Sequence, residues 1–364
     1  MEEIQQKEPN LATRPNGLDQ KEVNQGLENL SVVVEEVKSY EGDDMIGGNW
    51  TFIAVKNLTS YMIGTLMKGI KVIENEAEIY SRMLPVEENW LLKDIAYIEH
   101  LDCYVYLYRR QLYRKDIDDK LPYVIMKNIN GIRMSNIFQY SKLNRRLFLN
   151  NDNKSIFVIN LERNQIEMEI GKIRLTSNHY MNPFRLFGRH ENQFIAVTIS
   201  CSVLLFTINF KQKKICSSRG FQINMIEKQR EHGQSVAVSE DNRHALVQVA
   251  KEDLLGLSRM LVFNIKAGWL TLKAVIDQDS EEVPYMFAFD GCGSIGSHTL
   301  WVRMSYQDKV ISVFDFCEKT QELKELEEKR ATFDQTRVVE LRRVGDQIWY
   351  VGNQGRIMRL SINF

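Results

Sequence analysis

Apolar and polar positions alternate in short runs along almost the whole chain. From Ser31 onward, runs rich in Val, Ile, Phe, Tyr and Leu are separated by polar pairs such as Asn-Asp and Gly-Asp. Such alternation between turn residues is typical of half-buried strands. Helical periodicity is nearly absent, and the best helix candidate, Thr320–Arg330, also fits an edge strand. The pattern therefore predicts an all-β protein, either a sandwich, a barrel or a propeller.

A repeated strand ending decides among these three architectures. Most copies consist of an apolar residue, a polar residue and a second apolar residue. The polar residue stands at Glu74, Asp116, Asn160, Asn209, Asn264, Asp315 and Ser361. Successive copies are separated by 42, 44, 49, 55, 51 and 46 residues. A period in this range is typical of propeller blades, so the sequence predicts seven of them.

Each copy is flanked by strands that complete a four-stranded antiparallel unit. A hairpin lies upstream and, in most units, one further strand lies downstream. The predicted blades are 49–85, 90–130, 131–173, 174–222, 231–279, 281–330, and 336–364 together with 31–38. The last unit lacks a fourth strand, and the lone strand Ser31–Lys38 can supply it. The ring would then close by joining the two ends of the chain, which protects edges that could pair with other chains.

These units resemble the WD40-type β-propeller family over residues 31–364. Phe314-Asp315 and Lys115-Asp116 stand in the place of the family's Trp-Asp dipeptide. The sequence contains no Trp-Asp dipeptide, and no Gly-His pair opens a repeat. We therefore expect the family's structural His–Asp network to be absent. The resemblance implies a seven-bladed propeller that holds other proteins.

Composition adds a tail and narrows the classes of partner. Residues 1–28 have few large apolar side chains, which predicts a disordered N-terminal tail. The formal net charge of −1 argues against nucleic acid as a partner, because nucleic-acid binders normally carry a basic field. No signal-peptide pattern and no apolar run long enough for a membrane span is visible. We expect an intracellular protein, in the cytoplasm or alternatively in the nucleus.

Catalytic, metal and cofactor motifs are weak or absent. Gly291–Gly296 fits G-x-G-x-x-G, but a strand rather than a helix follows it, so we interpret it as a hairpin turn. The five cysteines form no C-x-x-C pair, and the six histidines lack metal-ligand spacing. We expect no catalytic residue, metal or cofactor, and no small-molecule substrate. An alternative is a hydrolase or lyase that uses carboxylates in the channel.

Basic and aromatic positions leave a second alternative open. Arg109-Arg110, Arg145-Arg146 and Arg342-Arg343 are doublets, the last two in predicted hairpin turns. They would suit a phosphoinositide or RNA binder if they shared one face of the ring. Solvated turn residues are the simpler interpretation. Tyr104, Tyr106 and Tyr108 alternate along one strand, which favours packing over base stacking.

The candidate binding residues lie in the loops that enter the blades. The longest irregular stretches, Thr176–His190 and Ile223–Gly233, precede the first strands of blades four and five. Loops held by a rigid scaffold concentrate binding residues, and aromatic and Arg side chains are enriched there. The candidate residues are Tyr180, Phe184, Arg185, Arg189, Arg133 and Trp90. Tyr180 and Phe184 could equally pack between blades. We expect a non-catalytic scaffold whose partners are subunits of a complex or peptide segments.

Overall fold

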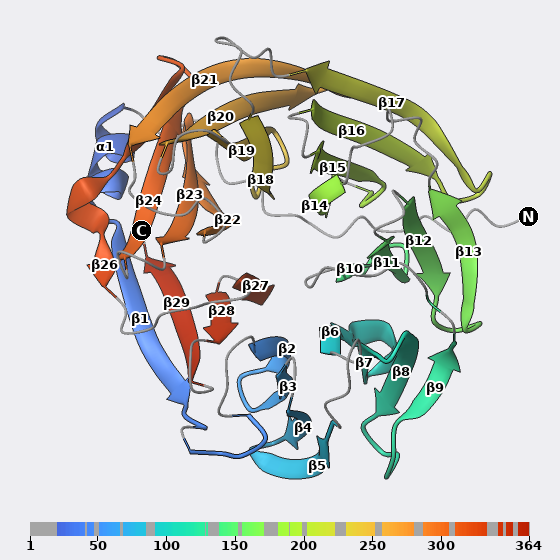
Figure 1. Cartoon of the computed structure of the whole chain (residues 1–364). Coiled ribbons are helices and arrows are strands. Elements are labelled where there is room, and N and C mark those ends of the chain that lie inside the picture. The colour runs from blue at the N-terminus through green and yellow to red at the C-terminus, as the bar shows by residue number, and fades with distance from the viewer. Residues whose placement is uncertain are drawn as a thin grey trace, which may run out of the picture.

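Seven antiparallel sheets stand around a central axis in the computed structural model (Figure 1). The structure describes residues 20–40, 42–46, 51–65, 68–84, 92–127, 129, 138–151, 155–170, 181–188, 190–198, 202–222, 231–251, 257–279, 287–305, 310–332, 341–344, 347–351 and 356–363. Within them the chain forms a seven-bladed β-propeller, as the spacing of the strand endings predicted.

Each blade has its first strand near the axis and its fourth strand on the outside (Figure 1). The first two blades comprise β2 (Thr51–Asn57), β3 (Ser60–Thr65), β4 (Gly69–Glu74) and β5 (Ala77–Met83), then β6 (Leu92–Ile98), β7 (Cys103–Tyr108), β8 (Gln111–Asp116) and β9 (Tyr123–Met126). Blades three and four comprise β10 (Phe138–Ser141), β11 (Arg146–Asn151), β12 (Ser155–Asn160) and β13 (Gln165–Ile170), then β14 (Met181–Phe187), β15 (Gln193–Thr198), β16 (Ser202–Asn209) and β17 (Lys214–Gln222).

The remaining blades follow the same order. Blade five comprises β18 (Glu231–Val238), β19 (His244–Lys251), β20 (Leu257–Lys266) and β21 (Trp269–Asp279). Blade six comprises β22 (Phe287–Ile295), β23 (His298–Ser305), β24 (Val310–Cys317) and β25 (Glu322–Glu325), with β26 (Ala331–Thr332) also pairing with β24. Blade seven comprises β27 (Leu341–Val344), β28 (Gln347–Val351), β29 (Ile357–Asn363) and β1 (Ser31–Lys38).

The ring closes through β1, as predicted. β1 pairs antiparallel with β29, placing Val34 opposite Leu360. Val32 and Val34 pack against the buried cluster between blades six and seven, and Arg359 donates hydrogen bonds to Glu35 across the pair. Apolar contacts on the inner side and an ion pair on the outer side therefore fix the register.

In blades three and four, the polar residue of the repeat stabilises the turn that follows the third strand. Asn160 is the last residue of β12, and its Oδ1 accepts hydrogen bonds from the backbone N–H groups of Glu162 and Arg163 at 2.9 and 3.1 Å. Asn209 ends β16, and its Oδ1 accepts the N–H of Gln212 at 2.9 Å. Short amide side chains form such turns readily. In other blades the polar residue contacts a side chain instead, as Glu74 does with Lys56 and Asp315 does with His298.

The core lies between the blades because both faces of each inner strand are buried. In β7, Tyr104, Tyr106 and Tyr108 pack toward blade one, which confirms the packing interpretation of these tyrosines. The alternate residues Val105 and Leu107 pack toward blade three. A strand buried on both sides contributes apolar area to two interfaces, at roughly 25 cal/mol per Å² removed from water.

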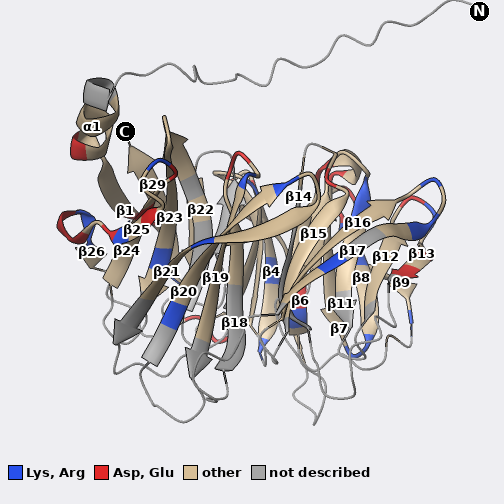
Figure 2. Ribbon diagram, turned by 90° about the horizontal axis from the view of Figure 1, so that it is seen from above, with Lys and Arg blue, Asp and Glu red and all other residues tan. Residues whose placement is uncertain are grey.

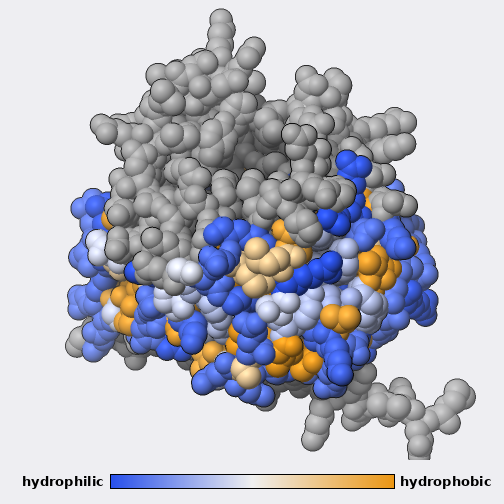
Figure 3. All heavy atoms as spheres, turned by 60° about the horizontal axis from the view of Figure 1, so that its bottom comes forward, coloured by the Kyte–Doolittle hydropathy of each residue, from blue (hydrophilic) through white to orange (hydrophobic). Residues whose placement is uncertain are grey.

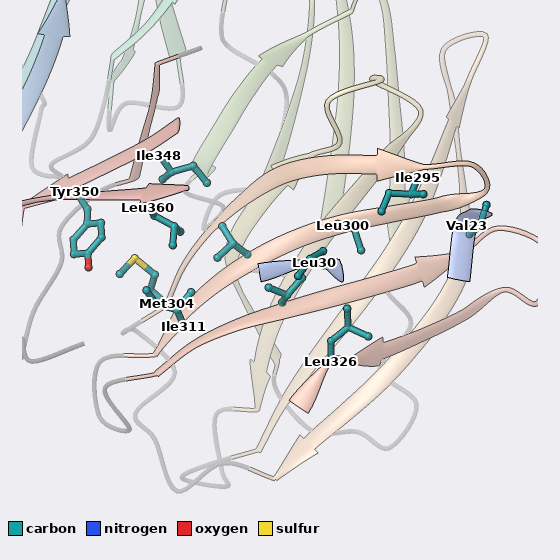
Figure 4. Packing of buried hydrophobic residues seen from close by; sticks show 12 residues of the cluster. Val23, Leu30, Ile295, Leu300, Met304, Ile311, Leu326, Ile348, Tyr350 and Leu360 are labelled. Carbon is teal, nitrogen blue, oxygen red and sulfur yellow. The ribbon is translucent and has the colours of Figure 1, made fainter. Parts of the chain in front are cut away.

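The predicted disorder of residues 1–28 is wrong for their last part. Residues Gln20–Asn29 form the helix α1, which lies on blade six (Figures 1 and 4). Val23 and the following Leu30 are 3 % and 2 % exposed and belong to the same cluster as Ile295. Val23 and Leu27 of the helix and Leu30 just after it are the apolar residues that pack on the surface of blade six. Residues 1–19 lie outside the described part of the chain.

Blade six also settles the alternative for Thr320–Arg330. The segment forms the edge strand β25, followed by a single 3-10 turn, η2 (Glu327–Lys329), rather than an α-helix. Leu323 and Leu326 are buried while Lys324 between them is exposed, a pattern that suits an edge strand and a tight turn.

Turns that join first to second strands and third to fourth strands share one face of the ring, which we call the turn face. The other 3-10 segment among the described residues, η1 (Glu99–Leu101), is part of one such turn in blade two. Figure 2 shows these turns along the upper rim, with α1 above them and both Lys/Arg and Asp/Glu among them.

Candidate interaction surface

Most of the binding residues predicted from the sequence lie outside the described part of the chain. These are Tyr180, Arg189, Arg133 and Trp90. Phe184 and Arg185 lie in the strand β14, opposite Ala196 and Ile195, not in an irregular loop. The expectation of an irregular stretch is therefore wrong for residues 181–187. The Asn182-Pro183 pair suggested an irregular segment in the sequence. In the structure, the pairing of β14 with β15 has a register shift between Asn182 and Phe184.

A similar correction applies to blade five. β18 begins at Glu231, so residues 231–233 of the second predicted irregular stretch are paired with β19. A register shift between Gly233 and Ser235 again marks the start of the innermost strand. The rest of this stretch, residues 223–230, lies outside the described residues.

The glycine-rich segment Gly291–Gly296 lies mostly in β22 rather than in a hairpin turn: residues 291–295 pair with β23, with a register shift between Gly291 and Gly293. Only Gly296 belongs to the turn that leads into β23. A Cβ on Gly291 would lie 2.6 Å from the carbonyl oxygen of Val238, so blades five and six approach closely there. Gly293 and Gly296 have φ of 147° and 57°. Blade packing and turn geometry thus account for all three glycines without a bound phosphate.

Two buried histidines connect blades five and six. His298, at the start of β23, has its Nδ1 2.9 Å from Oδ1 of the fully buried Asp315. His244, at the start of β19, has its Nδ1 3.2 Å from Thr299 Oγ1 in the next blade. Blade six therefore contains a His–Asp contact, although the family's structural His–Asp network was expected to be absent. The histidine comes from the start of the second strand, not from a Gly-His pair.

The surroundings of these histidines move their pKa values in opposite directions. The hydrogen bond to Asp315 raises the pKa of His298 above its ordinary value. Burial lowers the pKa of His244. Both side chains are almost completely buried, so we assign them to the blade interface rather than to surface chemistry.

Further polar contacts join neighbouring blades along the turn face. Lys56 of blade one forms an ion pair with Asp102 of blade two at 2.9 Å. Ser141 of blade three donates a hydrogen bond to Glu191 of blade four at 2.7 Å. The Gly188 N–H of blade four donates to Asn242 of blade five at 3.1 Å. These contacts hold the turns in fixed relative positions.

Two buried charged side chains of blade two form hydrogen bonds with backbone groups. The carboxylate of Asp94 in β6 accepts hydrogen bonds from the backbone N–H groups of Phe138 in blade three and of Ile95, each at 2.7 Å. The ammonium group of Lys115 donates to the carbonyl oxygens of Asp116 and Asp119, both at 2.6 Å. Burial lowers the pKa of Lys115. These groups stabilise the ring.

The arginine doublets do not share a face. Arg109-Arg110 lies between β7 and β8, on the face opposite the turn face, whereas Arg145-Arg146 lies between β10 and β11 on the turn face. Arg342-Arg343 lies in the strand β27 rather than in a turn. Arg146 also forms a two-fold hydrogen bond with Glu167, at 2.6 and 3.2 Å. This arrangement does not support a single phosphate-binding rim.

Exposed apolar side chains are scattered over the wall of blades one and two (Figure 3). They include Ile79 and Met83 of β5, and Leu121 and Tyr123 near β9. In Figure 3, hydrophobic residues of this face alternate with hydrophilic areas, an ordinary pattern for a protein surface.

The wall of blades four and five is different in kind. Trp269, the first residue of β21, is 56 % exposed. The Arg219 guanidinium carbon of β17 lies 4.1 Å from the centre of its ring system. Trp and Arg are the residue types most enriched at the energetic centres of protein interfaces. Sequence reasoning missed this pair because it searched the loops, whereas these residues come from outer strands.

Within the described residues, no group of three or more His, Cys, Asp and Glu side chains could hold a metal ion. No helix in the same part of the chain is long and apolar enough to cross a membrane. Cys103, Cys216 and Cys317 have free thiols, and burial raises the pKa of Cys103 to about 12.

Comparison with known proteins adds information on the fold. Neither a protein-family model nor a curated protein matches the sequence. The N-terminal domain of Nup159 superposes with a TM-score of 0.60 and 11 % identity, covering 93 % of this chain and 96 % of that one. A chain from a complex of S. cerevisiae Dbp5 with Nup159, Gle1, IP6 and ADP gives 0.60 and 10 %, with the same coverages. A Lactobacillus plantarum protein gives 0.56 and 11 %, covering 86 % and 88 %.

Proposed function

We propose that this propeller is a non-catalytic, WD40-like scaffold that binds other proteins as a subunit of a complex, in the cytoplasm or the nucleus. The observation that carries the proposal is the exposed pair of Trp269 and Arg219 on outer strands of adjacent blades. A large aromatic ring left in water is unfavourable unless a partner covers it, and removing it from water on binding stabilises a complex.

The use of the buried polar groups supports a binding role over catalysis. Asp94, Lys115 and the pair of His298 and Asp315 all contact backbone groups or each other. Such contacts stabilise the ring, and they give these groups hydrogen-bond partners within the protein rather than a substrate. The alternative interpretation of the sequence is an enzyme that uses carboxylates in the channel. No observation among the described residues specifically supports it.

The structural likeness supports the same general role by analogy. One similar structure contains Nup159 in an assembly with Dbp5 and Gle1, which are proteins. A shared fold does not define a partner, so the proposal for this chain takes over only protein binding.

The proposal predicts that the exposed pair is needed for capturing partners. Tagged wild-type chain is used to purify proteins from native lysate, beside a Trp269→Ala/Arg219→Ala variant. We expect a reproducible set of proteins with the wild type and its loss with the variant, because the variant removes the aromatic and cationic centre of the surface. Mass spectrometry identifies the set. Met83→Ala is the matched control, since Met83 is also 56 % exposed, on blade one.

Two other outcomes are informative. A chain that purifies alone contradicts the scaffold. A partner set that survives in the Trp269→Ala/Arg219→Ala variant but is lost in a Tyr180→Ala/Arg185→Ala variant moves the binding surface to the first strand and entry loop of blade four.

A further inference from the structure

The turn ends of the outer strands in blades four and five carry an excess of positive charge, whereas the far end of β21 contains Asp277 and Asp279. Residues 210–222 and 264–276 contain six Lys and Arg residues and no Asp or Glu. They supply the turn after the third strand and most of the fourth strand in each blade. The whole chain has a formal net charge of −1, so this concentration is local.

Exposure and proximity make one surface of these residues, which we call the basic wall. β17 lies next to β21 in the ring (Figure 1). Arg219 reaches from the first strand to Trp269 of the second. The basic wall consists of the exposed residues Lys211, Lys213, Lys214, Arg219, Lys266 and Trp269.

The backbone conformation of the two tight turns directs their charged side chains to solvent. Lys213 has a φ of 50°, a conformation of tight turns. The turn after Lys266 has positive φ at both Ala267 and Gly268, 49° and 78°, as a two-residue hairpin of this type requires. Trp269 follows at once and is therefore held at the end of a short, rigid turn.

The lysines of the basic wall differ from other cations of the turn face. Among the described residues, Lys211, Lys214 and Lys266 form no ion pair within the chain, whereas Lys213 lies near enough to Glu167 to help lower the pKa of that carboxyl. Basic residues of the neighbouring blades do form ion pairs, such as Arg146 with Glu167 in blade three and Arg330 with Glu325 in blade six. The charges of Lys211, Lys214 and Lys266 therefore remain available to a partner.

Strand geometry favours an extended partner. β17 and β21 are the last strands of their sheets, so one edge of each pairs with no other strand of its blade. Val275, in the middle of β21, is 45 % exposed, so a second apolar side chain lies farther along the strand, beyond Thr271 and Lys273. An extended peptide can follow such an edge and place alternate side chains on the wall.

We propose that the basic wall binds an acidic, extended segment of a partner protein, with an apolar side chain against Trp269 and carboxylates beside the lysines and Arg219. The inference rests on the proposed scaffold function and names the chemistry of its partner. Single-stranded RNA fits less well, because its binders stack several bases on several exposed aromatic rings. In the described part of this wall, Trp269 is the one exposed aromatic residue.

The test is a titration with a fluorescein-labelled synthetic peptide of Asp and Glu residues around a central Phe. Fluorescence anisotropy follows binding to the wild type, to Lys213→Glu/Lys214→Glu and to Trp269→Ala at low and physiological salt. We expect saturable binding that weakens as salt is raised. The double charge reversal and Trp269→Ala should each weaken it by on the order of tenfold. The matched control is Lys120→Glu/Lys324→Glu, two exposed lysines elsewhere on the turn face, with an expected change below about twofold.

Three results would overturn the proposal: no saturable binding of the acidic peptide, equal weakening by the control variant, or tighter binding of single-stranded RNA or of phosphoinositide-containing vesicles than of the peptide. All variants change exposed residues, and unfolding midpoints equal to that of the wild type confirm that they fold. If lysate proteins still co-purify while the peptide fails to bind, only the acidic-segment proposal fails. If no proteins co-purify, the scaffold function itself fails.

Discussion

Asp315 is fully buried, and its carboxylate lies 2.9 Å from His298 Nδ1. We expect Asp315→Asn to lower the free energy of unfolding by about 2 kcal/mol, because the amide keeps the shape but loses the charge-assisted hydrogen bond. Chemical denaturation measures the change. Glu318→Gln, in the exposed turn that follows, is the control, with a change of about 0.5 kcal/mol or less. Equal stability of Asp315→Asn and wild type would show that the pair contributes nothing.

The two histidines also predict how stability depends on pH. The pKa of His298 is raised above 6.5, so its contribution is present below pH 6.5 and is lost as the pH rises through the folded-state pKa. The pKa of His244 is lowered, so its contribution is present above pH 6.5 and is lost as the pH falls through the folded-state pKa. Unfolding curves across this range should show that Asp315→Asn selectively reduces the loss on the alkaline side. An unchanged alkaline limb would contradict the assignment to His298.

Among the elements, α1 depends on a few apolar contacts with blade six. A Cβ on Gly296 would lie 2.7 Å from a Val23 methyl group, which shows how closely the helix approaches the turn. We expect Val23→Ala/Leu30→Ala to destabilise the protein by about 3 kcal/mol or more, since both side chains are almost fully buried. Hydrogen exchange should increase in α1 and β1 before it does in blades two to four. Gln25→Ala, on the exposed helix face, should leave exchange unchanged.

The strands were predictable because their signals are local. A polar residue ends or nearly ends the third strand of each blade, and Asn160 also caps the turn that follows, so the repeat can be recognised within each blade. α1 was missed because Val23, Leu27 and Leu30 give a helix signal only when blade six is there to cover them. The surface pair was also missed, since Arg219 and Trp269 are separated by 50 residues and meet only through the packing of two blades.

The whole ring depends on the pairing of β1 with β29. A chain without residues 20–38 would expose the outer edge of β29 and the apolar surface that Val32 and Val34 cover. We expect such a chain to form dimers or larger oligomers, which light scattering after size-exclusion chromatography detects. A synthetic peptide with the sequence of Ser31–Lys38 should restore the monomer, and a scrambled peptide should not. A truncated chain that stays monomeric and unfolds cooperatively would show that β1 is dispensable for closure.

The same pairing sets an order of events during synthesis on the ribosome. β1 emerges before any other strand of the ring, yet its partner β29 emerges after all the others. Blades one to six can form as the chain lengthens, while Val32, Val33 and Val34 have no neighbouring strand to pair with. An unpaired, valine-rich strand is prone to wrong pairing for as long as it waits. The nascent chain is therefore most prone to wrong pairing at β1, the first strand to be synthesised. The time needed to translate six blades, rather than the rate of any folding step, determines how long β1 needs protection by chaperones.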